Sequence, residues 1–245
     1  MTKKHQIKVL DSFPSFRTTT VLIVIFLMYF LLRLLFFAAI LPPNAPPDEQ
    51  THVGIIQIYS KVFFLPENSS QTYEYGLVTN TPFLYYWIMG KALSLNILNI
   101  SDVLFLRLLN IPLAFATIFF IVSTLHLLTT DRITKILLVI MLTNTLMFSV
   151  LSASVSYDNL TNLLSAMSIY FFLAFLKYRN VNMLAATFLC QLAGSLTKIT
   201  FLPLILILNL ILIFREFKNI QYLPSFLKNH FCTPGLPPES CASWN

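Results

Sequence analysis

Residues 20–41 read TVLIVIFLMYFLLRLLFFAAIL, an apolar run that only Arg33 interrupts. A transmembrane helix needs about 20 predominantly apolar residues, so this run is long enough to cross a bilayer. The run is too long for the apolar core of a secretory signal peptide, and no small-residue cleavage site follows it. We therefore expect an uncleaved first transmembrane helix. The segment before it is basic and holds Lys3, Lys4, Lys8 and Arg17.

The composition extends this prediction to the whole chain. The 245 residues are 56% hydrophobic and 11% charged, with a mean hydropathy of +0.74. A soluble domain carries about 25% charged residues, so we expect lipid to cover much of this surface. The net charge of +6 does not indicate a nucleic-acid partner, because Lys and Arg form short clusters between apolar runs, where they orient membrane helices. The cysteines Cys190, Cys232 and Cys241 show neither a disulfide pattern nor a metal pattern.

Further apolar runs predict an all-α, multi-pass transmembrane helical bundle with about six spans and a helical outer loop. These runs are 108–128, 136–153, 160–176, 183–196 and 201–214. The fifth predicted span is short, and we expect it to be tilted or re-entrant. An aromatic run at 83–95 fits either an interfacial helix or an irregular seventh span. Its Tyr and Trp residues form either an interfacial belt or the lining of an access path for a lipid chain.

The basic residues predict the orientation of these helices. With the N-terminus in the cytoplasm, the inner connections hold the Lys and Arg residues of 132–135, 177–179 and 215–218, whereas most acidic residues lie outside. We expect an integral protein of a bacterial inner membrane or its equivalent. The predicted segments are a basic N-terminus (1–19), a first helix (20–41), an outer loop (42–106), about five further helices (107–214) and a tail (215–245).

The end of the chain differs in composition from the body. From Phe231 it reads FCTPGLPPESCASWN, which is rich in Pro, Ser and Cys and has no periodicity. The change indicates that the natural reading frame is lost near residues 228–231. A genuine polar tail is the alternative.

The outer loop offers the first candidate site, in the segment PDEQTH at 47–52. Asp48 and His52 are four residues apart, so on a helix they share one face. Such a pair holds a divalent metal, or it acts as a base with its orienting partner. Pro followed by Asp and Glu is also an ordinary helix start, because acidic residues in the first turn interact favourably with the helix dipole. Spacing alone leaves these interpretations open.

Further polar residues are candidates near the predicted outer face. Asp158 either shares that face with Asp48 or caps the next helix. Arg107, just before the second long span, either extends to the interface or clamps a phosphate with its guanidinium fork. Lys198 lies between two apolar runs, where ionisable residues are commonly functional. Arg33, inside the first helix, is expected to pair with an acidic residue of a neighbouring helix.

Taken in order, these features resemble the N-terminal half of the glycosyltransferase C superfamily, multi-pass enzymes that use polyprenyl-phosphate-linked sugars. The resemblance covers roughly residues 20–214 and is closest to uncharacterised membrane proteins of that superfamily. It rests on a basic-led helix before a large outer loop and on the order of several motifs. These are Pro-Pro-Asp-Glu-x-x-His at 46–52, Thr-Pro-Phe-Leu-Tyr-Tyr-Trp at 81–87, Arg107 opening the next helix, Tyr-Asp-Asn at 157–159 and Leu-Thr-Lys-Ile-Thr at 196–200.

The resemblance implies that Asp48 is the catalytic base or a metal ligand, with Glu49 beside it. It also implies a catalytic role for Glu49 and substrate-binding roles for His52, Arg107, Asp158 and Lys198. The cofactor stays open, and Asp48 and His52 are the candidate ligands if it is a divalent metal. The donor would be a polyprenyl-phosphate sugar, with the acceptor at the outer face.

Family members are longer, and their second half helps to form the lipid-phosphate and acceptor sites. We therefore expect the 245-residue chain to lack robust turnover. A transport or binding protein whose charges line a substrate path is one alternative, and an inactive truncated product is another.

Overall fold

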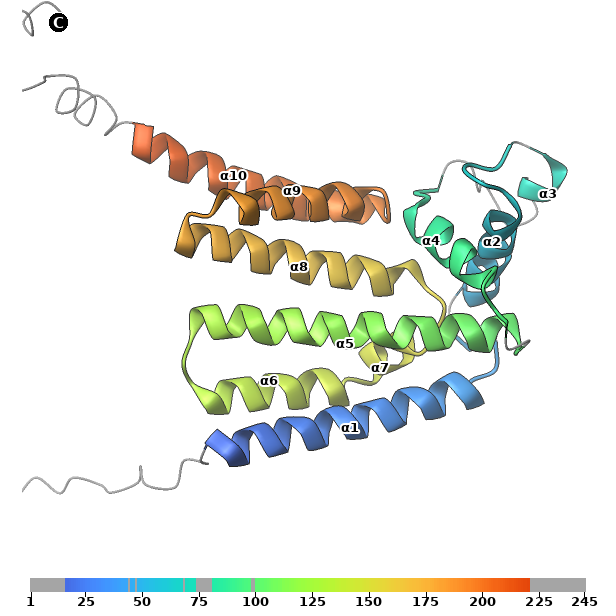
Figure 1. Cartoon of the computed structure of the whole chain (residues 1–245), viewed down its shortest axis with the longest axis horizontal. Helices are drawn as coiled ribbons and strands as arrows, with labels where there is room; N and C mark the ends of the chain where they lie inside the picture. Colours follow the sequence, from blue (N-terminus) through green and yellow to red (C-terminus); the bar gives the residue numbers. More distant parts are fainter. Residues whose placement is uncertain are drawn as a thin grey trace, which may run out of the picture. The chain divides into compact units, whose positions relative to one another are not determined.

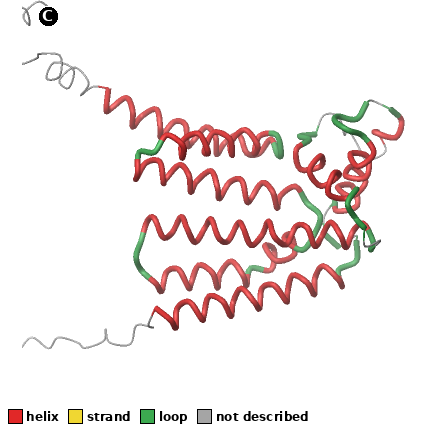
Figure 2. The backbone as a smooth tube through the Cα atoms, viewed as in Figure 1, coloured by secondary structure: helices red, strands yellow, loops and turns green. Residues whose placement is uncertain are grey.

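The computed structural model describes residues 16–43, 45–46, 48–67, 69–73, 81–97 and 100–220. Every regular element within these ranges is helical, which confirms the predicted all-α fold (Figure 2). The basic N-terminal residues, Pro47, Asn80 and the tail beyond 220 lie outside the described residues. The chain divides into two units, Met1–Phe201 and Leu202–Asn245, and each is described by itself.

Three helices are long and apolar enough to cross a membrane. They are α1 (Phe16–Ile40), α5 (Asp102–Leu128) and α8 (Tyr157–Tyr178). Only 17%, 22% and 39% of their respective apolar windows are buried inside the protein. Contiguous apolar surface of this extent is unusual on soluble monomers and fits contact with lipid.

The predicted third span, 136–153, is interrupted. It forms α6 (Arg132–Asn144) and α7 (Leu146–Ser152), which bend by 65° and count as a fourth span only when taken together. A helix end leaves backbone carbonyls without intrahelical partners. Arg33 donates from Nη1 to the carbonyl of Thr143 at 3.1 Å, close to the bend. The expected acidic partner of Arg33 is therefore replaced by a carbonyl group at a broken helix.

The remaining predicted spans also form helices. α9 (Val181–Ser195) covers the fifth run, and α10 (Leu202–Ile220) covers the sixth and belongs to the second unit. Both apolar stretches are shorter than the three long helices. Each predicted apolar run thus forms a helix. Among the described residues, three helices are long and apolar enough to be spans, or four if the bent pair α6–α7 is one span.

The outer loop contains α2 (Glu49–Lys61), α3 (Ser70–Tyr73) and α4 (Leu84–Leu93). With 10 residues, α4 is too short for a seventh span, since about 20 are needed. It packs on α2 through Gly90, where an added Cβ would lie 2.9 Å from the backbone nitrogen of Ser60. Only glycine allows the two helices to approach so closely.

A hydrophobic cluster centred on the contact between α1 and α5 forms one part of the core of the first unit. Its buried members are Phe30, Leu34, Ala38, Ile111, Ala114, Ile118 and Ala153. The ring of Phe30 stacks on that of Phe148 from α7, with centroids 5.7 Å apart. Figure 1 shows α1, α6, α5 and α8 side by side, with α2 and α4 at one end of this group. The candidate residues of the outer loop are therefore held against one end of the helices.

Candidate functional site

Glu49 and Arg107 form a buried ion pair. Nε of Arg107 donates to Oε1 of Glu49 at 2.9 Å, and its Nη2 donates to Oε2 at 2.5 Å. This bidentate geometry engages both carboxylate oxygens and is the strong form of such a pair. The Arg107 side chain is only 3% exposed and the Glu49 side chain is 0% exposed.

The pair joins several segments. Nη1 of Arg107 also donates to the carbonyls of Ala38, at 2.9 Å, and Leu41, at 2.7 Å. These carbonyls belong to the end of α1, where intrahelical partners run out. The backbone N–H of Val155 donates to Oε1 of Glu49 at 2.8 Å. The pair therefore fastens α2 to α1, α5 and the connection before α8.

These contacts change the predicted roles of both residues. Arg107 does not precede its helix but lies in the second turn of α5, which begins at Asp102. Its donors face Glu49 and two backbone carbonyls, and little of the side chain is exposed. The geometry therefore favours a structural role over the phosphate contact expected of Arg107 and the catalytic role expected of Glu49.

Asp48 has a different environment from its neighbour. It is exposed and immediately precedes α2, with φ 58° and ψ 9° in the left-handed region. Asp visits this region more readily than most residues, although such a conformation still costs about 1–3 kcal/mol. Its side chain makes no capping hydrogen bond. The Pro-Asp-Glu segment is thus a helix start, as one of the two interpretations predicted, with Glu49 in the first turn and no capping bond from the Asp48 side chain.

His52 lies one turn further along α2. Its backbone N–H donates to the carbonyl of Asp48 at 3.0 Å, so the two residues occupy adjacent turns as predicted. Nδ1 of His52 lies 2.9 Å from the hydroxyl of Tyr86, and its ring meets that of Tyr157 edge-on at 4.7 Å. Burial lowers the pKa of His52 below 6.5, and the nearby carboxylates of Asp48 and Asp158 only partly oppose this.

Asp158 and Lys198 form a second ion pair. Nζ of Lys198 lies 2.5 Å from Oδ1 of Asp158, and it also lies 4.6 Å from the ring centroid of Tyr157. The Lys198 side chain is 25% exposed and the Asp158 side chain is 32% exposed. The cap of α8 is Ser156, whose hydroxyl accepts from the N–H of Asp158, so capping does not account for the carboxylate.

The structure brings His52, Asp158 and Lys198 together around the ring of Tyr157, and Asp48 lies one helical turn from His52. His52 interacts electrostatically with Asp48, Asp158 and Lys198, as well as with Glu49. The predicted placement of Asp48, His52 and Asp158 at one end of the helices agrees with these interactions. No group of three or more His, Cys, Asp or Glu able to hold a metal occurs within the described ranges.

Two tyrosines of the predicted aromatic segment are buried inside the protein. Tyr85 and Tyr86 are 0% and 2% exposed, and burial raises the pKa of both hydroxyl groups. Tyr85 exchanges hydrogen bonds with Asn110, which holds α4 against α5. The contact of Tyr86 with His52 joins residues 34 positions apart, and no local pattern predicts it.

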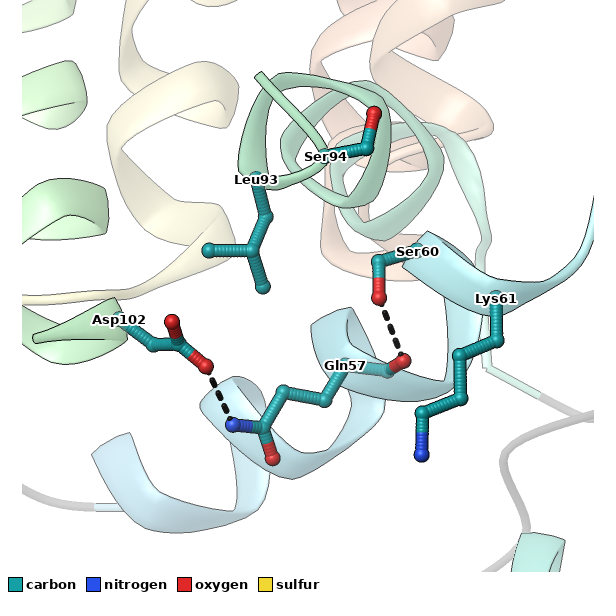
Figure 3. A pocket seen from close by; sticks show the side chains of 6 residues that line it. All are labelled: Gln57, Ser60, Lys61, Leu93, Ser94 and Asp102. Atoms are coloured by element: carbon teal, nitrogen blue, oxygen red, sulfur yellow. Dashed lines mark hydrogen bonds between the residues drawn. The ribbon is translucent and has the colours of Figure 1, made fainter. Parts of the chain in front are cut away.

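A separate hollow of about 340 Å³ lies between α2, α4 and the start of α5 (Figure 3). In it, Nε2 of Gln57 donates to Oδ2 of Asp102 at 2.7 Å. None of the predicted site residues lines this hollow. We assign the Gln57–Asp102 contact to the attachment of α2.

The four gathered residues provide complementary chemical groups. An exposed carboxylate in Asp48 can accept a proton, and a buried imidazole in His52 stays neutral near pH 7. A partly exposed ammonium group in Lys198 can bind an anion. Comparison with known protein families, with curated proteins and with solved structures finds no match to this chain.

Proposed function

We propose that this protein is a membrane transferase, or the N-terminal part of one, that moves a sugar from a polyprenyl phosphate to an acceptor hydroxyl. The observation that carries the proposal is the gathering of Asp48, His52, Asp158 and Lys198 at one end of apolar helices. A substrate with a lipid chain and a phosphate can reach such a site from the bilayer. The resemblance to the glycosyltransferase C superfamily is the reason for proposing a sugar as the transferred group.

Asp48 is the proposed general base. Its carboxylate removes the acceptor hydroxyl proton while the oxygen attacks the anomeric carbon of the sugar. The bond between that carbon and the phosphate oxygen breaks, and the polyprenyl phosphate leaves with the electron pair. The exposure of Asp48 and the lack of a capping bond support this role, because its carboxylate remains accessible to an acceptor.

Lys198 is the proposed phosphate contact. An ammonium group stabilises the charge that develops on the leaving phosphate. Asp158 positions Lys198 over the ring of Tyr157 before the substrate binds. The partial exposure of this ion pair supports the role, since an incoming phosphate can reach Nζ without disrupting a buried network.

The first test measures donor binding and transfer with the purified chain in lipid nanodiscs, using a labelled polyprenyl-phosphate sugar. We expect saturable binding that Lys198→Ala weakens and Asp48→Asn leaves intact. Any transfer to an acceptor or to water should fall by at least about 100-fold in Asp48→Asn, which is the lower range for general-base catalysis. Asp131→Asn, an exposed acidic residue at the turn between α5 and α6, is the matched control.

Two results would overturn the proposal. Absence of donor binding to the native chain would exclude the substrate class. Equal loss of binding in Asp131→Asn and Lys198→Ala, which change the net charge in opposite directions, would show a general disturbance of the protein rather than a specific site.

The bent pair α6–α7 favours a second candidate function. Transporters often place their substrate sites at discontinuous helices, and Arg33 lies at this break. A transport protein would move a labelled substrate across sealed vesicles without chemical change. Recovery of intact substrate from the vesicle interior, combined with full transport by Asp48→Asn, would favour this function over transfer.

A further inference from the structure

An apolar turn follows α2 and is exposed on the surface of the outer loop. Phe63, Phe64 and Leu65 are 89%, 61% and 50% exposed, respectively. Exposed large apolar residues that are consecutive in the chain indicate contact with another apolar medium. We call these three residues the aromatic turn.

The aromatic turn is attached to α4. Nε1 of Trp87 donates to the carbonyl of Phe63 at 3.2 Å, and Nζ of Lys91 donates to the carbonyls of Tyr59 and Val62. The rings of Phe64 and Phe83 also lie 6.5 Å apart. The turn is therefore held in place with its apolar side chains outward.

The level of the aromatic turn relative to a surrounding lipid layer follows from its link to α9. The backbone N–H of Leu84, at the start of α4, donates to the carbonyl of Leu196 at 3.0 Å. In α9, Leu189 and Leu192 are 67% and 59% exposed, so the outward face of this helix is apolar close to that link. A lipid layer covering this face of α9 would end near the level of α4 and of the turn fastened to it.

We propose that the aromatic turn is a membrane-interface anchor, immersed at the boundary between the lipid headgroups and the acyl chains. Trp and Phe are well suited to this boundary. Lys61, which is exposed, lies just before the turn, and lysine stems reach from apolar surroundings to phosphate groups. The anchor holds α2 and α4 on the leaflet, and with them His52 and Tyr86.

The depth of a tryptophan placed in the turn tests the proposal. The natural tryptophans are Trp87 and Trp244. In a chain with both changed to Phe, Phe63→Trp provides one reporter at a position that is 89% exposed and contributes little packing. The protein is reconstituted in phosphatidylcholine brominated either high or low on the acyl chains. We expect blue-shifted emission that upper-chain bromine quenches at least twofold more than lower-chain bromine.

Met28→Trp in the same background is the matched control. Met28 lies midway along α1 and is 52% exposed, so lower-chain bromine should quench it more strongly. A second reporter, the natural Trp87 in Trp244→Phe, leaves the turn unchanged and should behave like the reporter at position 63. Water-like emission at both positions, quenched by iodide and not by brominated lipid, would overturn the anchor. That result would indicate contact with water or with another protein.

Discussion

Two ion pairs at the same end of the helices show how similar contacts serve different purposes. Glu49–Arg107 and Asp158–Lys198 each include an oxygen–nitrogen distance of 2.5 Å. The first pair is almost fully buried and makes further bonds to three backbone groups, two at the end of α1 and one before α8. The second is partly exposed and rests against one aromatic ring.

The difference separates structure from candidate function. A buried pair whose hydrogen-bonding groups are occupied cannot exchange partners without leaving a charge unpaired. A partly exposed pair exchanges one partner for a ligand at small cost. Position and residue type suggested similar roles for Arg107 and Lys198, and only their environments distinguish them.

The largest expected effect comes from removing the cation of the buried pair. Arg107→Met leaves Glu49 buried without a counter-charge, so we expect a loss of about 3–5 kcal/mol in the free energy of unfolding. Thermal unfolding in a mild detergent would show it as a lower midpoint. The double variant Glu49→Gln with Arg107→Met should recover part of the loss, because the amide oxygen still accepts from Val155. A single variant as stable as the native chain would contradict the structural role.

A smaller effect should follow from Arg107→Lys, which keeps the charge but not the fork. Lysine cannot reproduce the two parallel bonds to Glu49 together with the bonds to Ala38 and Leu41. We expect a loss of about 1–3 kcal/mol, since one or two buried acceptors lose their donor. The same unfolding measurement checks this value. Full stability in Arg107→Lys would show that charge alone, rather than bidentate geometry, holds the segments.

His52 lies between the two pairs and should make stability depend on pH. Burial lowers its pKa in the folded state, so the unfolded chain binds the proton more readily. The stabilisation is complete above pH 6.5 and is lost as the pH falls through the lower folded-state pKa. The slope from this one group is at most about 1.4 kcal/mol per pH unit.

Unfolding midpoints are measured from about pH 8 to about pH 5, a range that includes the charge change of a histidine. Over this range the midpoint should decrease less in His52→Gln than in the native chain. The native chain and the variant should differ by a nearly constant amount above pH 6.5. Parallel pH profiles for the two chains would contradict the buried, neutral histidine.

The helices were predictable from the sequence because apolar runs and helix starts are local signals. The Pro-Asp-Glu segment predicted the start of α2, which begins at Glu49. The bend in 136–153 was missed, although Asn144 and Thr145 interrupt the apolar run and were the available signal. Local composition thus identified the elements and missed a break that the three consecutive polar residues 143–145 mark.

The partners within the site could not be predicted, because they depend on how distant segments pack. Glu49 and Arg107 are 58 positions apart, and Glu49 and Val155 are 106 apart. The sequence identified Asp48, His52 and Asp158 as residues at one end of the helices. It contained no signal that Glu49 would be buried while its neighbour Asp48 remained exposed.

The smallest expected effect concerns the exposed pair. Lys198→Met removes the partner of Asp158, which at 32% exposure still retains water, so stability should change by no more than about 1 kcal/mol. Raising the salt concentration should reduce even this difference, because mobile ions screen exposed charges, whereas the defect of Arg107→Met should persist. Unfolding midpoints of both variants at low and high salt test the contrast directly. A salt-independent loss in Lys198→Met as large as that in Arg107→Met would show that both pairs are structural, and Lys198 would then cease to be a candidate for phosphate binding.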